Sequence, residues 1–329
     1  MTFDERLTEF AGLPVVDFPE FPYGMLPDVD PGAVAWRIGI DGTYAAMQKN
    51  HPDTIEGTFA GFLHRIDPAK VRALIFGATC HQDEQDVNDA AKLLVAQAER
   101  FPALRALFLG EVVSEESDVA YLFGAELTPV LAAFPALEIL GARGTYVDYQ
   151  PSAVDRITAR LAPTSHHALR RLVLESGGLE PQAVRNILAS DLPNLEHLEL
   201  YFGDPHFGGD TAAADLAPLW PGDVFPNLRS LGLRDAVIQD EIAAALADAP
   251  IVARLEVLDL SLGALSDEGM AALLAGQPLT HLKKLDLHHH FLSDAMIARV
   301  RGALPGVEVD LGEKQEPHHS GKRYVAVSE

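Results

Sequence analysis

Aspartate and histidine side chains recur at regular spacing in the last part of the chain. Asp259 and Asp286 are 27 residues apart, and each is the fifth residue of a similar phrase, LEVLDL and LKKLDL. Asp310 has the same place in GVEVDL, and His288 follows two residues after Asp286. Carboxylate oxygens and imidazole nitrogens ligate transition metals, and both groups also serve acid–base chemistry. Asp259, Asp286, His288 and Asp310 are therefore candidate metal ligands if the fold brings them together.

Three histidines in succession, His288–His290, are the most conspicuous local feature. Successive side chains of a strand point to opposite faces, so the three imidazoles cannot all reach one ion. We interpret His290 as a residue that satisfies the backbone of a turn. His288 and His289 are then surface residues.

No motif typical of a catalytic centre accompanies these residues. The chain lacks G-x-S-x-G, G-x-x-x-x-G-K-[ST], H-E-x-x-H and C-x-x-C. Cys80 is the single cysteine, so no intrachain disulfide can form. We interpret Cys80 as a packing residue and not as a nucleophile beside His81. We therefore expect no catalytic residues and no cofactor.

Internal repeats are the elements that position these side chains. The phrase L-x-x-L-x-L recurs, and successive copies from Val71 to Leu282 start 26 to 33 residues apart. Helix-like text separates the copies: in residues 266–276, Ser266 is a plausible N-cap, and Met270 and Leu273 share one helical face. A single strand–helix unit cannot bury both of its apolar faces, whereas stacked units can. We expect about ten units, with parallel strands on one side and helices on the other.

Units of 26 or 27 residues with a helix on the convex side resemble the ribonuclease-inhibitor-like class of leucine-rich repeats. The chain also resembles a bacterial family of cytoplasmic leucine-rich repeat proteins in LTEFAGLPVVDF, LSDEGMAALLAGQPLTHLKKLDLHHH and RYVAVSE. The resemblance implies an α/β solenoid, horseshoe-like, over residues 35–312, and it implies no activity. We expect residues 1–34 to cap the first repeat. Residues 313–329 form a tail whose end can return as a short edge strand.

The third, fifth and seventh residues of each unit are expected on the concave face of the sheet. These residues are small and apolar in the first units and charged in the later ones. Like charges on adjacent strands destabilise a sheet, so the aspartates need neighbouring basic groups, a cation or a basic partner. We predict a protein-binding face that contains Glu175, His197, Glu199, Tyr201, Arg234, Asp259, Lys284, Asp286 and His288.

The overall charge narrows the class of partner. The chain has 25 Lys and Arg against 48 Asp and Glu, a formal charge of −23. Such a charge argues against nucleic acid and against anionic membranes. We expect a cytoplasmic, non-enzymatic interaction scaffold whose partner carries a basic patch. The alternatives are a metal-binding protein or metal-dependent hydrolase that uses the aspartate row, and an inhibitor or accessory subunit of a neighbouring enzyme.

Overall fold

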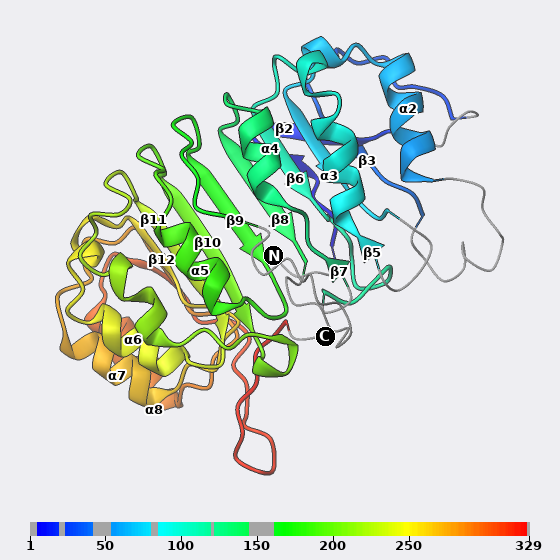
Figure 1. Ribbon diagram of the computed structural model, residues 1–329. Coiled ribbons are helices and arrows are strands. Elements are labelled where there is room, and N and C mark those ends of the chain that lie inside the picture. Colours follow the sequence, from blue (N-terminus) through cyan, green and yellow to red (C-terminus); the bar gives the residue numbers. More distant parts are fainter. Residues whose placement is uncertain are drawn as a thin grey trace, which may run out of the picture. The chain divides into compact units, whose positions relative to one another are not determined.

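Two compact units divide the chain, residues 1–161 and residues 162–328. The computed structural model describes residues 5–19, 24–41, 54–79, 85–119, 122–144 and 161–327. Each unit is a mixed α/β layer in which helices cover one side of a largely parallel, open sheet (Figure 1). Cys80 and His81 lie outside the described residues.

The sheet of the first unit contains β1 (Glu9–Phe10), β2 (Leu13–Asp17), β3 (Ala35–Ile38), β4 (Ala73–Phe76), β6 (Ala106–Leu109) and β8 (Ile139–Arg143). Strands β1 and β2 are antiparallel, and every other neighbouring pair is parallel. The helices are α2 (Ile55–Arg65), α3 (Val87–Val95) and α4 (Leu127–Ala133). Two short strands, β5 (Gln85–Asp86) and β7 (Leu122–Phe123), pair with each other beside this sheet.

The N-terminal segment covers the apolar face of the first unit's sheet. Ile75 and Phe108, which point away from the helices, are buried beneath Leu7 and the side chains of β1 and β2. The ring of Phe10 meets that of Phe108 edge to face at 6.1 Å. This segment is the one expected to cap the first repeat. It extends the sheet, because β2 pairs with β3, and it shields the small apolar face of the sheet from solvent.

The sheet of the second unit is parallel throughout. It contains β9 (Arg171–Glu175), β10 (His197–Gly203), β11 (Ser230–Ala236), β12 (Val257–Asp259), β13 (Lys284–Asp286) and β14 (Glu308–Asp310). The helices are α5 (Pro181–Leu188), α6 (Gln239–Leu246), α7 (Asp267–Ala275) and α8 (Asp294–Ala303). Equivalent residues of successive phrases pair directly, so that Leu231, Leu258 and Leu285 lie side by side and are fully buried. The alternation of strand side chains then places the fifth residues on the opposite face.

Short 3-10 helices connect several elements. They are η1 (Pro68–Lys70) and η2 (Ala98–Arg100) in the first unit, and η4 (Pro205–Phe207), η5 (Ala213–Leu219) and η6 (Pro250–Arg254) in the second.

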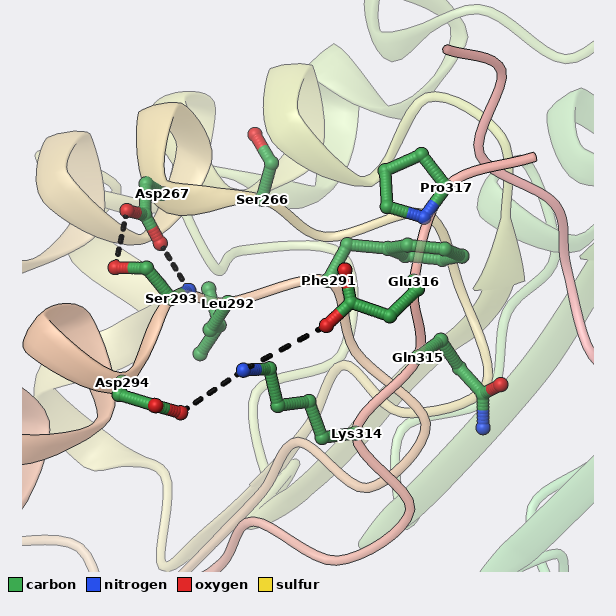
Figure 2. A pocket seen from close by; sticks show the side chains of 10 residues that line it. All are labelled: Ser266, Asp267, Phe291, Leu292, Ser293, Asp294, Lys314, Gln315, Glu316 and Pro317. Carbon is green, nitrogen blue, oxygen red and sulfur yellow. Dashed lines mark hydrogen bonds and ion pairs between the residues drawn. The ribbon is translucent and has the colours of Figure 1, made fainter. Parts of the chain in front are cut away.

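A repeated Ser-Asp pair joins the starts of neighbouring helices in the second unit. Ser266 caps α7 as expected, because its hydroxyl accepts a hydrogen bond from the Glu268 amide. The carboxylate of Asp267 in turn accepts hydrogen bonds from the amide (2.8 Å) and hydroxyl (2.7 Å) of Ser293, the N-cap of α8 (Figure 2). Asp240 bonds Ser266 in the same way. This ladder ties the start of each helix to the start of the next one.

The C-terminal residues run back over the second unit. Val325 and Val327 are buried, although no strand is assigned within residues 315–327. The expected edge strand does not form, because the Ala326 and Val327 amides bond to a turn carbonyl and to a buried carboxylate. Within the described residues, no helix has the length and apolar character needed to span a bilayer.

Candidate functional site

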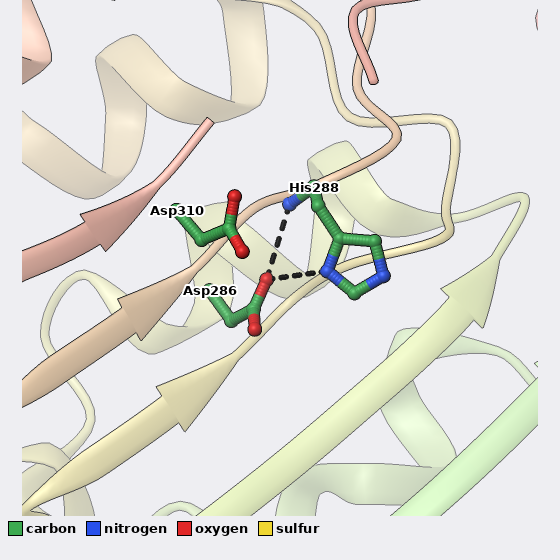
Figure 3. A group of neighbouring side chains, drawn as sticks. All are labelled: Asp286, His288 and Asp310. Atoms are coloured by element: carbon green, nitrogen blue, oxygen red, sulfur yellow. Dashed lines mark hydrogen bonds and ion pairs between the residues drawn. The ribbon is translucent and has the colours of Figure 1, made fainter. Parts of the chain in front are cut away.

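The predicted row of aspartates is present in the second unit. Asp259 pairs in register with Asp286, and Asp286 with Asp310, across the parallel strands β12, β13 and β14. Neighbouring strands lie about 4.8 Å apart, so three carboxyl groups occupy one line across the sheet. Two of them are shown in Figure 3 beside His288. The line arises because each aspartate has the same position in its phrase and the phrases pair in register.

Arg234 is the central cation of the site. Its Nη1 atom lies 2.5 Å from Glu199 Oε1, and its Nε atom lies 2.9 Å from Ser261 Oγ and 3.4 Å from Asp259 Oδ2. The guanidinium group also lies over the ring of Tyr201, 4.7 Å from its centroid. Arg234 is 5% exposed, so its charge acts in a poorly solvated environment where ion pairs are strong.

The two carboxylates that flank Arg234 are compensated unequally. Burial disfavours ionised Glu199, but the hydrogen bond from His197 and the charge of Arg234 outweigh burial and hold the Glu199 pKa well below 4.5. For Asp259, burial and the neighbouring charge of Asp286 outweigh Arg234, and the pKa rises above 3.8. Asp259 is therefore a carboxyl group that would be stabilised in its charged form by a further cation.

Asp286 is already saturated with donors. Lys284 Nζ lies 2.8 Å from its Oδ2 atom, and His288 meets Oδ1 through Nδ1 at 2.6 Å and through its amide at 3.2 Å (Figure 3). Burial works against the charged form, but these hydrogen bonds hold the Asp286 pKa well below 3.8.

Three of the four candidate metal ligands converge. Ligand atoms of Asp286, His288 and Asp310 lie within 4.8 Å of one another, whereas Asp259 pairs with Arg234 instead. A metal ion at this point would compete with Lys284, and it would replace the bond between His288 Nδ1 and Asp286 if it were ligated by that nitrogen. The donor set fits a transition metal in type, but its strongest acceptor is already used.

Burial separates the predicted partner-binding residues into two groups. Five of them are at most 9% exposed and present little surface to a partner: Glu175, Glu199, Tyr201, Arg234 and Asp286. His197, Asp259, Lys284 and His288 are partly exposed, and Arg171 and Glu308 at the ends of the third-residue row are exposed. The binding set predicted from sequence did not include Arg171 or Glu308, although the repeat register that placed Lys284 on this face also places these two.

The outcome for the histidine run is mixed. His290 is fully buried, accepts a hydrogen bond from the Leu292 amide at 3.1 Å, and lies 3.3 Å from the Leu311 carbonyl. Its interpretation as a turn residue is confirmed. His289 is buried against Phe291 and Tyr324, so its interpretation as a surface residue is wrong. The returning C-terminal segment covers it.

A serine, a histidine and an aspartate also meet near the start of the second unit. Ser165 Oγ and Asp191 Oδ2 lie 3.1 Å and 3.0 Å from the same Nε2 atom of His167. A catalytic triad needs the serine and the carboxylate on different ring nitrogens. The side chains of His167 and Asp191 are also largely exposed. This group is therefore a surface hydrogen-bond cluster.

Two pockets lie outside the aspartate row. One of about 470 Å³ lies beside the starts of α7 and α8, and its Lys314 bonds Asp294 at 2.9 Å and approaches Glu316 at 3.8 Å (Figure 2). The other, of about 420 Å³, lies in the first unit, where Arg37 bonds Asp17 and Arg6 bonds Glu116. Within the described residues, the basic groups of both pockets are already paired with carboxylates.

Acid should remove the stabilisation that Glu199 supplies. Its folded-state pKa lies below 4.5, so the contribution is complete above that pH and is lost as the pH falls towards the folded value. We expect Glu199→Gln to unfold more easily than wild type at neutral pH and to lose less stability on acidification. Urea unfolding at several pH values from about pH 7 to 3 measures this, with Glu196→Gln as control because Glu196 is a half-exposed glutamate that bonds Arg170. Parallel pH profiles for wild type and Glu199→Gln would refute it.

The fold and the site define an α/β protein of open parallel sheets with a charged row on one strand face. No family model and no curated protein matches the chain. The crystal structure of a protein from Bacteroides fragilis is similar, with a TM-score of 0.74 and 27% identity. The match covers 89% of this chain and 77% of that one. This similarity supports the α/β fold, and the name of that protein states no activity.

Proposed function

We propose that the chain is a leucine-rich repeat solenoid that binds a basic partner protein through the strand face of β12–β14. The repeat assignment is supported by the parallel register of equivalent leucines and by the Ser-Asp ladder with its 27-residue spacing. The observation that carries the function is the row of Asp259, Asp286 and Asp310 in register on adjacent strands.

The charge balance of this face favours a cationic partner. Arg234 bonds Glu199 more closely than Asp259, and Lys284 bonds Asp286. Glu308, one strand beyond Lys284, adds a further exposed negative charge. A lysine or arginine side chain from a partner would lie against Asp259, whose charge Arg234 compensates incompletely, and against the partly exposed Asp310, because Asp286 already has its donors. Such complementarity raises association rates and selects partners.

The other two functions predicted from the sequence remain alternatives. A metal site is favoured by the convergence of Asp286, His288 and Asp310 within 4.8 Å. An inhibitor or accessory role adds a consequence to the same binding event and uses the same face.

A lysine-rich peptide labelled with fluorescein tests the proposed face. Asp310→Asn/Glu308→Gln removes two exposed or partly exposed charges from β14, and Glu241→Gln/Glu268→Gln removes two exposed charges from the helices. We expect the first pair to raise the Kd about tenfold, equivalent to about 1.4 kcal/mol, and the second to leave it nearly unchanged.

Two outcomes would contradict the proposal. Equal weakening by both pairs would show attraction to net charge alone, without a defined face. Stoichiometric binding of Zn²⁺, measured by calorimetry and abolished by His288→Ala, together with no peptide binding, would favour the metal site instead.

A further inference from the structure

The returning C-terminal segment crosses three successive repeats of the second unit. We call residues 323–327 the strap, and we call Asp235, Leu262 and His289 the turn row. These three residues have the eighth position of successive units: Asp235 lies near the end of β11, and Leu262 and His289 follow β12 and β13. The strap lies along these three residues, so it contacts a surface to which three successive units contribute. We call this surface the seat of the strap.

Main-chain groups of the strap bond to each residue of the turn row. The Val327 amide donates to Asp235 Oδ1 at 2.9 Å, and the Ala326 amide donates to the Leu262 carbonyl at 2.8 Å. His289 Nε2 lies 3.4 Å from the Tyr324 carbonyl. Recognition through the main chain is how extended peptides are commonly held, with side-chain pockets adding specificity.

Side chains of the strap alternate between the protein and solvent. Val325 and Val327 are 4% and 7% exposed, whereas Ala326 between them faces solvent. The Tyr324 ring packs edge to face against Phe291, with a centroid distance of 5.3 Å, and Arg323 Nη1 bonds Asp240 Oδ2 at 2.8 Å. The strap therefore contacts the protein through a basic residue, the ring of an aromatic residue that is 44% exposed, and two buried aliphatic residues two positions apart.

The backbone of the turn row has an energetically unfavourable conformation. Asp235, Leu262 and His289 all have positive φ angles, between 55° and 66°, which residues other than glycine seldom adopt. Asp235 is fully buried, and its Oδ2 atom has no hydrogen-bond partner. Its other oxygen bonds the strap. A buried carboxyl oxygen without a partner is uncommon in a native protein and calls for an explanation.

A loop separates the strap from the rest of the repeats. Residues 316–322 are all exposed, and the loop is closed on itself by bonds between His318 and the main chain of Lys322 and Gly321. Figure 1 shows this loop, in red, projecting from the second unit. The strap is thus attached to its seat as a tethered peptide, whose effective concentration the loop sets.

We propose that the turn row is a binding groove for an extended segment of a partner protein with the strap's pattern, a basic residue, an aromatic residue and alternate aliphatic residues, and that the strap is its built-in competitor. Displacing the strap opens the groove. This surface lies at the strand ends, so the proposal is independent of binding on the face of β12–β14.

A labelled peptide with the sequence of residues 323–329 tests this inference on the full chain. Val327→Asp places a charge at a buried position beside Asp235 and should release the strap. Ala326→Asp makes the same change at the neighbouring exposed position and should leave the strap seated. We expect the peptide to bind Val327→Asp at least tenfold more tightly than wild type or Ala326→Asp, because the tethered competitor is gone.

Hydrogen exchange of the wild-type chain provides a second measurement that does not depend on the folding of a variant. A displaceable strap predicts that the Ala326 and Val327 amides exchange at least tenfold faster than the Leu260 and Leu287 amides, which bond neighbouring repeats. Equal exchange of all four amides would overturn the proposal, since the strap would then open only with the whole unit. Equal peptide affinity for the two variants would overturn it as well.

Discussion

Replacing Arg234 by methionine is expected to lower the free energy of unfolding by about 3–5 kcal/mol. Methionine preserves most of the apolar stem but leaves the buried carboxylate of Glu199 without its cation and removes the strongest opposing charge from Asp259. Urea denaturation at neutral pH, followed by circular dichroism, measures the change.

Arg171→Met is the matched control for this prediction, because Arg171 is an exposed arginine of the same sheet. We expect it to change stability by less than about 0.5 kcal/mol. Adding Glu199→Gln to Arg234→Met should restore part of the loss, because the uncompensated charge then disappears. A loss below about 1 kcal/mol for Arg234→Met would show that the guanidinium group does not hold the site together.

Phe62→Ala is expected to destabilise the first unit by about 3–5 kcal/mol. Phe62 is fully buried on α2, and its ring lies 5.3 Å from Phe18, 5.9 Å from Trp36 and 6.4 Å from Phe59. Truncation removes both the apolar contacts and the edge-to-face packing, and it leaves a cavity. Tryptophan fluorescence during denaturation follows the loss, because Trp36 is in the same cluster.

Phe62→Leu is the control and should cost about 1 kcal/mol, because leucine keeps most of the buried volume. If alanine and leucine had the same effect, the aromatic cluster would not be the core of this unit.

The repeated phrases of the sequence predicted the parallel order of the strands and the alignment of the site residues on neighbouring strands. Each phrase has the same length, so aligning the leucines of β11, β12 and β13 also aligns Gly232, Asp259 and Asp286. The turn role of His290 followed from its position after the strand. These features depend on local pattern and on the stacking of like units, both of which can be read from spacing.

Contacts between distant positions could not be predicted in this way. Arg234 approaches Asp259 and Glu199 from the seventh position of its own unit, and no pattern states which carboxylate it prefers. The N-terminal segment covers Phe108, and the strap reaches Asp235 from 92 residues away. Such contacts depend on where a non-repeating segment folds back, which has no periodic signature.

Chemical-shift mapping with the lysine-rich peptide tests the binding face most directly. If β12–β14 form that face, the amides of Val257, Lys284 and Glu308 should shift as the peptide is added, and the shifts should diminish as salt screens the charges. The amides of α7 and α8 should not move. Shifts confined to those helices, or spread evenly over the acidic surface, would contradict a partner site on the aspartate row.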